Sequence, residues 1–115
     1  MPAHSETRFS PYSPAQIYDL VIAVERYPEF IPWCRAARIT ERSEKHFLAE
    51  LVISFRHLTE RYTSRVIGTS GGEAPEIHVE LVSGPFEYLT NHWRFEPSGA
   101  GTNIQFHVDF RFRSR

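Results

Sequence analysis

The residues best suited to covalent chemistry are the single cysteine and the serines. Cys34 is the only cysteine among the 115 residues. A thiol or hydroxyl nucleophile needs a base positioned beside it, and the sequence contains neither a nucleophile-elbow motif nor a recognisable cysteine and histidine signature. Cys34 follows Trp33 directly, which favours a small buried apolar side chain. We therefore predict no catalytic residue and expect that the protein is not an enzyme.

Six histidines are the residues that could bind a metal ion. The last two predicted strands would pair Phe95 with Ile104. In that register His92 lies opposite His107, and Asp109 follows on the same face, which makes a set of ligands that Zn²⁺ accepts. All three lie on the polar face of the pattern, however, and no HxH, HExxH or CxxC spacing is present. Solvated cross-strand pairs explain these residues better, and we predict no metal site.

Four polar residues interrupt the apolar rows of the predicted strands and are candidates for hydrogen bonding to a ligand. They are Glu60, Ser64, Ser83 and Asn91. A buried polar side chain needs a hydrogen-bond partner. Either these residues lie at strand ends near water, or they bind a ligand carbonyl or the water that bridges to it. The sequence leaves both alternatives open.

The segment 24–34 concentrates large apolar and aromatic side chains around two prolines. Pro28 and Pro32 each fix φ, lack an N–H group and push the preceding residue toward extended geometry. We therefore expect one short helical turn that Pro28 opens and Pro32 closes. Tyr27, Phe30 and Ile31 should share a face of this turn, with Trp33 just beyond it. They form either a plug that packs into the core or a mobile lid over an apolar cavity.

The elements that would position these residues are one helix and about seven antiparallel strands. Ser13 is a favoured N-cap, Pro14 suits the first helical position, and apolar residues then recur at helical spacing to about Ala23. After Cys34 the apolar period becomes two. The predicted strands cover residues 4–10, 35–42, 47–55, 58–67, 77–83, 89–95 and 104–112, with turns at Ser43-Glu44-Lys45, Arg56-His57 and Gly84-Pro85-Phe86-Glu87. One face of the sheet is apolar and the other polar, so an α+β domain that packs on one side of its sheet is predicted.

Composition limits the classes of function. At 115 residues the chain is long enough for one domain, residues 1–115, with one core. A net charge of −1 and a pI near 6.6 provide no global basic field, so we predict no DNA partner. The N-terminus lacks the pattern of a signal or transit peptide, and no run is long enough to span a membrane. We expect a cytoplasmic protein, with any membrane contact limited to the periphery of the inner membrane.

Several blocks of the sequence resemble a known family. They are Tyr12-Ser13, Leu20-Val21, the run 24–34, Gly84-Pro85-Phe86, Leu89, Trp93-Arg94-Phe95-Glu96-Pro97, Gly101-Thr102 and Asp109-Phe110. Over residues 12–112 the chain resembles the coenzyme Q-binding START-domain proteins, which belong with the ribosome association toxin RatA and the polyketide cyclase/dehydrase-like group. The Tyr-Pro-x-Phe-x-Pro-Trp-Cys block is the specific part of this resemblance. It implies a helix-grip fold, in which a curved antiparallel sheet wraps a long C-terminal helix and leaves a tunnel for a lipid-like ligand.

The sequence departs from this family at its C-terminal end. It stops at Arg113-Ser114-Arg115, where the family continues into the long C-terminal helix. Without that helix the apolar strands would expose a larger apolar face than soluble monomers tolerate. We therefore expect either a truncated chain or a partner that covers the face.

The resemblance implies a non-catalytic protein that binds ubiquinone (coenzyme Q) or a related polyisoprenoid quinone, supports respiration or quinone biosynthesis, and contacts respiratory complexes. No cofactor is implied beyond this ligand. A quinone offers only acceptors, so Ser64 or Asn91 could donate to it, whereas Glu60 could do so only when protonated. Apolar side chains would surround the isoprenoid tail. The predicted ligand-binding residues are Tyr27, Phe30, Ile31, Trp33, Leu51, Ile53, Phe55, Tyr62, Ser64, Leu81, Phe86, Leu89, Asn91 and Trp93.

Two alternatives to quinone binding stay open. The first is a RatA-like regulator that binds the large ribosomal subunit and blocks subunit association. Contact with rRNA normally uses clusters of lysine and arginine, which the near-neutral charge disfavours. Local basic patches are still available at Arg35, Arg38 and Arg42, and at Arg111, Arg113 and Arg115. The second is a polyketide cyclase/dehydrase-like enzyme, which the lack of a recognisable acid and base pair makes the least favoured.

Overall fold

The computed structural model describes residues 3–44, 46–55 and 58–113. In chain order its elements are β1 (Ala3–Ser10), α1 (Pro14–Ile22), the 3-10 helix η1 (Val24–Glu29), β2 (Cys34–Arg42), β3 (His46–Phe55), β4 (Leu58–Thr69), β5 (Glu76–Ser83), β6 (Phe86–Ser98) and β7 (Gly101–Phe112). Three parts of the predictions lie outside the described residues: Lys45 of the first turn, the Arg56-His57 connection, and Ser114 with Arg115 at the C-terminal end.

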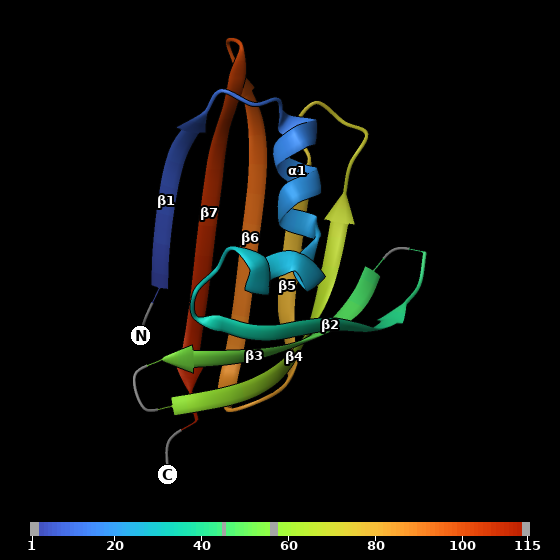
Figure 1. The fold of residues 1–115 in the computed structure, drawn as a ribbon. Coiled ribbons are helices and arrows are strands. Elements are labelled where there is room, and N and C mark those ends of the chain that lie inside the picture. The colour runs from blue at the N-terminus through green and yellow to red at the C-terminus, as the bar shows by residue number, and fades with distance from the viewer. Residues whose placement is uncertain (1–2, 45, 56–57, 114–115) are drawn as a thin grey trace.

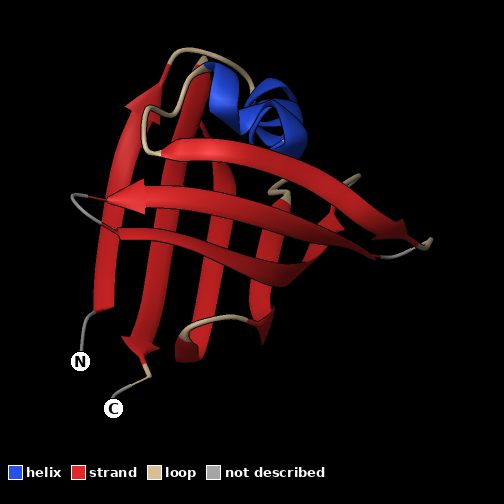
Figure 2. Ribbon diagram, turned by 60° about the horizontal axis from the view of Figure 1, so that its bottom comes forward, coloured by secondary structure: helices blue, strands red, loops and turns tan. Residues whose placement is uncertain are grey.

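The strands form one antiparallel sheet in the order β1-β7-β6-β5-β4-β3-β2. Consecutive strands pair from β2 to β7, and β1 pairs with β7, so the first and last strands lie side by side (Figure 1). The sheet is strongly curved: β2, β3 and β4 run across the direction of β6 and β7, and α1 lies against the concave face (Figures 1 and 2). The predicted α+β fold, a curved antiparallel sheet with N-terminal helices, is confirmed.

The helix α1 begins where the sequence predicts. The Ser13 side chain accepts a hydrogen bond from the Gln16 backbone N–H at 3.2 Å, and the Gln16 side chain accepts one from the Ser13 N–H at 3.0 Å. This capping box satisfies donors that a helix start leaves free. Ile17 is buried, and the Tyr18 ring meets Phe95 edge-on with 6.2 Å between centroids. Packing across β5, β6 and β7 thus fixes α1 and the segment that follows it.

The proline-containing segment after α1 differs from its prediction. The 3-10 helix η1 begins at Val24 and contains Pro28, whereas the sequence predicts a turn that starts at Pro28. Because the fixed φ of proline suits a helical turn, Pro28 removes only one backbone donor from η1. The N–H groups of Phe30 and Ile31 both donate to the Tyr27 carbonyl, at 3.1 and 2.8 Å, and continue the turn past Pro28. The predictions that Pro28 opens the turn and that Tyr27 is extended are therefore wrong.

The large side chains of this segment separate into two groups. Tyr27 and Ile31 pack against the core, and the Tyr27 hydroxyl donates to the Val21 carbonyl at 2.6 Å. Phe30 and Trp33 are 51% and 53% exposed. The Tyr27 and Phe30 rings still meet edge-on, with 5.8 Å between centroids. The predicted common face is thus only partly formed, because the turn starts four residues earlier than predicted and rotates the later side chains outward.

The predicted alternation of the strands is confirmed by the core. In β2, Ala37 and Ile39 pack inward, as the sequence predicts. The register of the last hairpin is also confirmed, since Phe95 pairs with Ile104. The buried apolar cluster consists of Ile17, Val24, Cys34, Phe47, Ala49, Leu51, Val66, Ile77 and Phe95.

The last two strands extend beyond their predicted limits because a tight turn joins them. Gly99 in this turn has a φ of 58°, a left-handed conformation that favours glycine. Pro97 lies inside β6 although proline cannot donate to a sheet. Two residues earlier, the Phe95 N–H donates to the Pro75 carbonyl, just before β5 begins. The Pro97 nitrogen therefore lies past the end of that neighbouring strand, where no sheet hydrogen bond is lost.

The described chain ends directly after the last strand, β7. Within residues 3–44, 46–55 and 58–113 no long C-terminal helix follows β7, as predicted. Phe112, the last residue of β7, is 51% exposed, whereas α1 covers the part of the apolar face around Phe95. The helices of the described segments are too short or too polar for any of them to span a membrane.

Candidate functional site

The concave face of the sheet brings most of the predicted ligand-binding residues together. Strand pairing sets Leu51 beside Tyr62, and Ser64 beside Leu81. Tyr27 packs against the same core from η1. From β6 the sheet adds Phe86, Leu89, Asn91 and Trp93, whose neighbours on β5 and β7 continue the apolar rows. The twofold alternation of the strands, together with the register shift between Phe86 and Tyr88, therefore gathers the strand side chains on one surface.

Four aromatic residues form a continuous surface at one end of this face, which we call the aromatic wall: Tyr62, Phe86, Phe110 and Phe112. The Phe86 ring meets Tyr62 and Phe110 edge-on, with centroids 5.5 and 6.0 Å apart, and stacks on Phe112 at 4.9 Å. Phe86 is buried at the centre of these contacts. Phe110 and Phe112 are absent from the predicted ligand-binding residues, although the period-two pattern of the last strand places both on this face.

The Tyr62 hydroxyl is a polar group in these apolar surroundings. Burial raises the pKa of Tyr62 to about 12, and burial also raises the pKa of Tyr27. Both hydroxyls therefore stay protonated at neutral pH and can donate a hydrogen bond. The Tyr27 hydroxyl uses its proton on the Val21 carbonyl. Tyr62 is the residue of the aromatic wall that can donate to a ligand oxygen.

Cys34 is a buried residue of the core, as predicted. It is 3% exposed, and its thiol lies 3.6 Å from the Ala36 carbonyl. Burial raises the pKa of the Cys34 thiol. A raised pKa reduces the thiolate population that a nucleophile needs. The environment of Cys34 is therefore that of a structural cysteine.

The four interrupting polar residues have different environments. Ser83 is exposed at the end of β5, and Glu60 is half-buried near the start of β4. These two fit the strand-end interpretation. Ser64 is 2% exposed and lies between Ala49 and Leu81 in the middle of the sheet. Of these three residues, only Ser64 lies deep in the apolar face.

Asn91 has partners within the protein. Its side-chain nitrogen donates to the His107 carbonyl at 2.9 Å, and its side-chain oxygen accepts from the Trp93 indole N–H at 2.8 Å. The amide therefore holds the Trp93 ring in place on the concave face. One hydrogen of the Asn91 amide is left for any other acceptor. Positioning Trp93 is the role that the geometry gives to Asn91.

The remaining predicted residues lie at the edge of this group or outside the described side chains. Phe30 and Trp33 are half exposed beyond η1, and Ile53 pairs with Cys34 at the start of β2. The side chain of Phe55 lies outside the described part of the chain. Two surface hollows are lined by none of the predicted residues. One, of about 490 Å³, follows β2, and the other, of about 620 Å³, lies at the start of α1.

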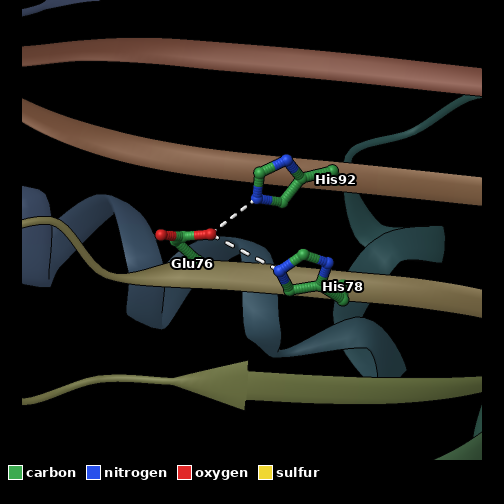
Figure 3. Close-up of side chains that lie close together, drawn as sticks. All are labelled: Glu76, His78 and His92. Carbon is green, nitrogen blue, oxygen red and sulfur yellow. Dashed lines mark hydrogen bonds and ion pairs between the residues drawn. The ribbon is translucent and has the colours of Figure 1, made fainter.

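The convex face carries a cluster that the sequence analysis missed. Glu76 and His78 on β5 and His92 on β6 bring their ligand atoms within 4.8 Å of one another (Figure 3). The predicted pairing of His92 with His107 is confirmed, but the His107 ring accepts or donates a hydrogen bond with Ser5 at 2.6 Å. The signal for the cluster is the Glu-x-His spacing on β5, together with the register of the hairpin that follows.

Comparison with known proteins places the chain in a family. Residues 10–115 match the family described as polyketide cyclase / dehydrase and lipid transport. The chain is 40% identical to the ribosome association toxin RatA of Rickettsia prowazekii, over 99% of the chain and 79% of that protein. It is 30% identical to the mitochondrial coenzyme Q-binding protein COQ10 homolog B of Xenopus laevis, over 96% of the chain and 46% of that protein.

A solved structure shows the same fold. A START superfamily protein from Mycobacterium smegmatis superposes with a TM-score of 0.83 at 17% identity, over 97% of this chain and 78% of that one. At this identity the likeness concerns the fold alone, and it confirms the START-like, helix-grip architecture that the curved sheet displays. The chain therefore belongs to the polyketide cyclase / dehydrase and lipid transport family, and it is related to the RatA proteins over nearly its whole length.

Proposed function

We propose that the protein binds an apolar small molecule, a polyisoprenoid quinone such as ubiquinone, against the concave face of its sheet, without catalysing a reaction. The aromatic wall is the observation that carries this proposal. Its rings make a continuous apolar surface from β4 to β7, and Phe112 at its edge is still 51% exposed. Flat aromatic side chains can pack against a quinone ring and an isoprenoid tail.

A quinone needs a hydrogen-bond donor because its carbonyl oxygens only accept. Tyr62 supplies this donor in the proposal, since burial keeps its hydroxyl protonated. Ser64 lies two residues further along β4 on the same face and is a second donor. Asn91 acts indirectly, because its amide orients the Trp93 indole. The half-exposed Phe30 and Trp33 then form a lid at the edge of the bound tail.

The relatives support this ligand class in part. One of them is named for coenzyme Q binding, and the family description includes lipid transport. Transfer of a quinone to a respiratory complex or to the membrane periphery is the role that such binding would serve. The same family description includes cyclases and dehydrases. The buried Cys34 thiol and the apolar character of the wall support a non-catalytic role.

Binding of a short-tailed ubiquinone, measured by equilibrium titration, tests the proposal. Tyr62→Phe removes the donor and keeps the ring, so we expect about a fivefold loss of affinity, the equivalent of about 1 kcal/mol for one hydrogen bond. Tyr88→Phe is the matched control, because Tyr88 pairs with Arg111 and its hydroxyl lies near Asp109 on the opposite face of the sheet from the wall. Equal affinities for the two variants would exclude Tyr62 as the donor, and no saturable binding by the unchanged protein would refute the proposal.

Association with the ribosome is a second candidate function, because the RatA relative named for it is 40% identical over almost the whole chain. The basic residues of β2 are the surface that could contact rRNA. Arg35, Arg38 and Arg42 are all exposed. Arg38 lies 2.8 Å from Glu50, and Arg42 lies 4.0 Å from Glu25, so acidic neighbours partly neutralise this surface.

Charge reversal separates the two functions. If the ribosome is the partner, replacing Arg35, Arg38 and Arg42 with glutamate abolishes co-sedimentation with large subunits and leaves quinone binding intact. Arg8→Glu, a change on the distant strand β1, is the control. A contact with rRNA phosphates should also weaken as salt is raised. Co-sedimentation that neither salt nor the triple change affects would exclude this surface.

A further inference from the structure

The cluster of Glu76, His78 and His92 is held by the most regular part of the sheet. Glu76 and His78 are two residues apart on β5, so their side chains emerge on the same face. His92 lies directly opposite His78 on β6. The two imidazole rings stack with 4.1 Å between centroids and 18° between planes. Strand pairing therefore fixes all three residues without a flexible loop.

The ligand atoms of this cluster converge on one point. The Nε2 atom of His92 lies 2.7 Å from Oε1 of Glu76, and the Nε2 atom of His78 lies 3.4 Å from the same oxygen. Figure 3 shows both rings aimed at the Glu76 carboxylate from neighbouring strands. We propose that Glu76, His78 and His92 form a binding site for a divalent transition-metal ion, with Zn²⁺ the best match.

The donor set and the spacing both support this assignment. Two imidazole nitrogens and one carboxylate are a known ligand set of Zn²⁺, with water at the fourth position. Zinc–ligand bonds of about 2.0 to 2.1 Å in a tetrahedron put ligand atoms roughly 3.3 Å apart. The distance from Glu76 to His78 already matches, whereas the distance from Glu76 to His92 must lengthen by some tenths of an ångström. The metal would replace the hydrogen bond between Glu76 and His92.

The surroundings of the cluster suit a cation. Arg94 Nη1 lies 2.9 Å from the other Glu76 oxygen, Oε2, and so orients the carboxylate while leaving Oε1 for the metal. Glu96 lies 3.3 Å from Arg94 and offsets its positive charge. With neutral imidazoles, Glu76, Arg94 and Glu96 together carry a net charge of −1. The His78 side chain is 54% exposed and leaves the site open to solvent.

This site is independent of the proposed quinone site, because it lies on the opposite face of the sheet. It also departs from the expectation that the protein has no metal site. That expectation rests on His92, His107 and Asp109, and the structure replaces two of these three residues with Glu76 and His78. The Glu76 carboxylate, which both imidazole rings contact, distinguishes the new set from the solvated pairs that the sequence predicts.

Titration of the metal-free protein with ZnCl₂, followed by calorimetry at neutral pH, tests the inference. We expect one Zn²⁺ per chain, no comparable binding of Mg²⁺, and a loss of affinity of at least about tenfold in both His78→Ala and His92→Ala. His107→Ala is the matched control, since it removes a histidine of the same face that bonds to Ser5 instead. It should leave the affinity unchanged.

Two results would overturn the assignment. One is the absence of Zn²⁺ binding by the unchanged protein. The other is a Zn²⁺ affinity that His78→Ala leaves intact, which would place the ion at other histidines. If His92→Ala fails to fold because the Glu76 contact is lost, His78→Ala still decides the question, because His78 is more exposed and makes only the longer 3.4 Å contact.

Discussion

Tyr62 shows how the surroundings of a single residue set its chemistry. Its position on β4 turns the ring toward Phe86, and burial raises the pKa of its hydroxyl to about 12. A phenol in water would begin to ionise near its ordinary pKa of 10. On the concave face the same group stays a hydrogen-bond donor throughout the physiological range. A tyrosine at this position suggests a hydrogen-bond donor, and burial among aromatic rings keeps its hydroxyl protonated.

The raised pKa of Tyr62 makes the protein sensitive to alkali. The unfolded chain ionises this group near pH 10, before the folded protein does at about 12. The free energy of unfolding should therefore be unaffected below pH 10 and fall as the pH rises from 10 toward 12. Tyr27 acts in the same direction. Denaturant unfolding across this range measures the effect.

Two variants test whether Tyr62 causes the loss of stability at alkaline pH. Tyr62→Phe removes the ionisable group, so its unfolding free energy should decline less steeply above pH 10 than that of the unchanged protein. Tyr12→Phe is the control, because Tyr12 is 59% exposed. An alkaline decline that is identical in all three proteins would show that the burial of Tyr62 does not limit stability at high pH.

At the scale of elements, the exposure of the segment after α1 bears on whether this segment is a core plug or a lid. Phe30 is 51% exposed, whereas Phe95 is completely buried. Phe95→Ala should lower the free energy of unfolding by about 3 to 5 kcal/mol, as for other emptied aromatic sites. Phe30→Ala should cost under about 1 kcal/mol, in the range of exposed positions. In the lid interpretation Phe30→Ala instead speeds the release of bound quinone.

Denaturant melts of both variants, with and without ubiquinone, measure the changes in stability, and a time course of quinone release from each variant measures the rate. The lid interpretation fails if Phe30→Ala unfolds the protein as readily as Phe95→Ala does. It also fails if Phe30→Ala leaves the rate of quinone release unchanged. Pro28→Ala adds a further comparison, because it restores one backbone donor to η1 while it loosens the turn.

The elements differ in how far the sequence predicts them. Strong alternation, as in Phe47, Ala49 and Leu51, predicts both the strand and its inward face, because only one register buries the apolar set. The start of η1 is mispredicted because proline is tolerated within a helical turn as well as at its beginning. Pro97 is a similar case, since its position in a strand depends on where the neighbouring strand β5 ends.

The residues of the candidate site also differ in how far the sequence predicts them. The concave face is predictable wherever one residue in two is apolar, which is why Tyr62, Leu81 and Trp93 all lie on that face. Exposure at Phe30 is not predictable, because it depends on the exact start of η1. Prediction of the convex cluster requires the register between β5 and β6. The register of β5 and β6 pairs His78 with His92, but the contribution of Glu76 appears only once the side chains are placed.

For the whole molecule, the curved sheet presents two faces with different chemistry. The concave face holds the core, α1 and the aromatic wall. The convex face holds charged and imidazole side chains, among them the pair of Arg65 and Glu80 at 2.6 Å. The two faces allow two independent kinds of binding, an apolar ligand on one side and a metal ion on the other. Relatives named for quinone binding and for ribosome association share this family.

Identification of any small molecule that co-purifies with the protein tests the proposed quinone binding most directly. The protein is purified without detergent from a quinone-producing host and extracted with organic solvent, and the extract is analysed by mass spectrometry. We predict a polyisoprenoid quinone in a near-equimolar amount, with less in Tyr62→Phe and an unchanged amount in Tyr88→Phe. An extract without quinone, from folded protein that also fails to retain added ubiquinone, would contradict the proposed function.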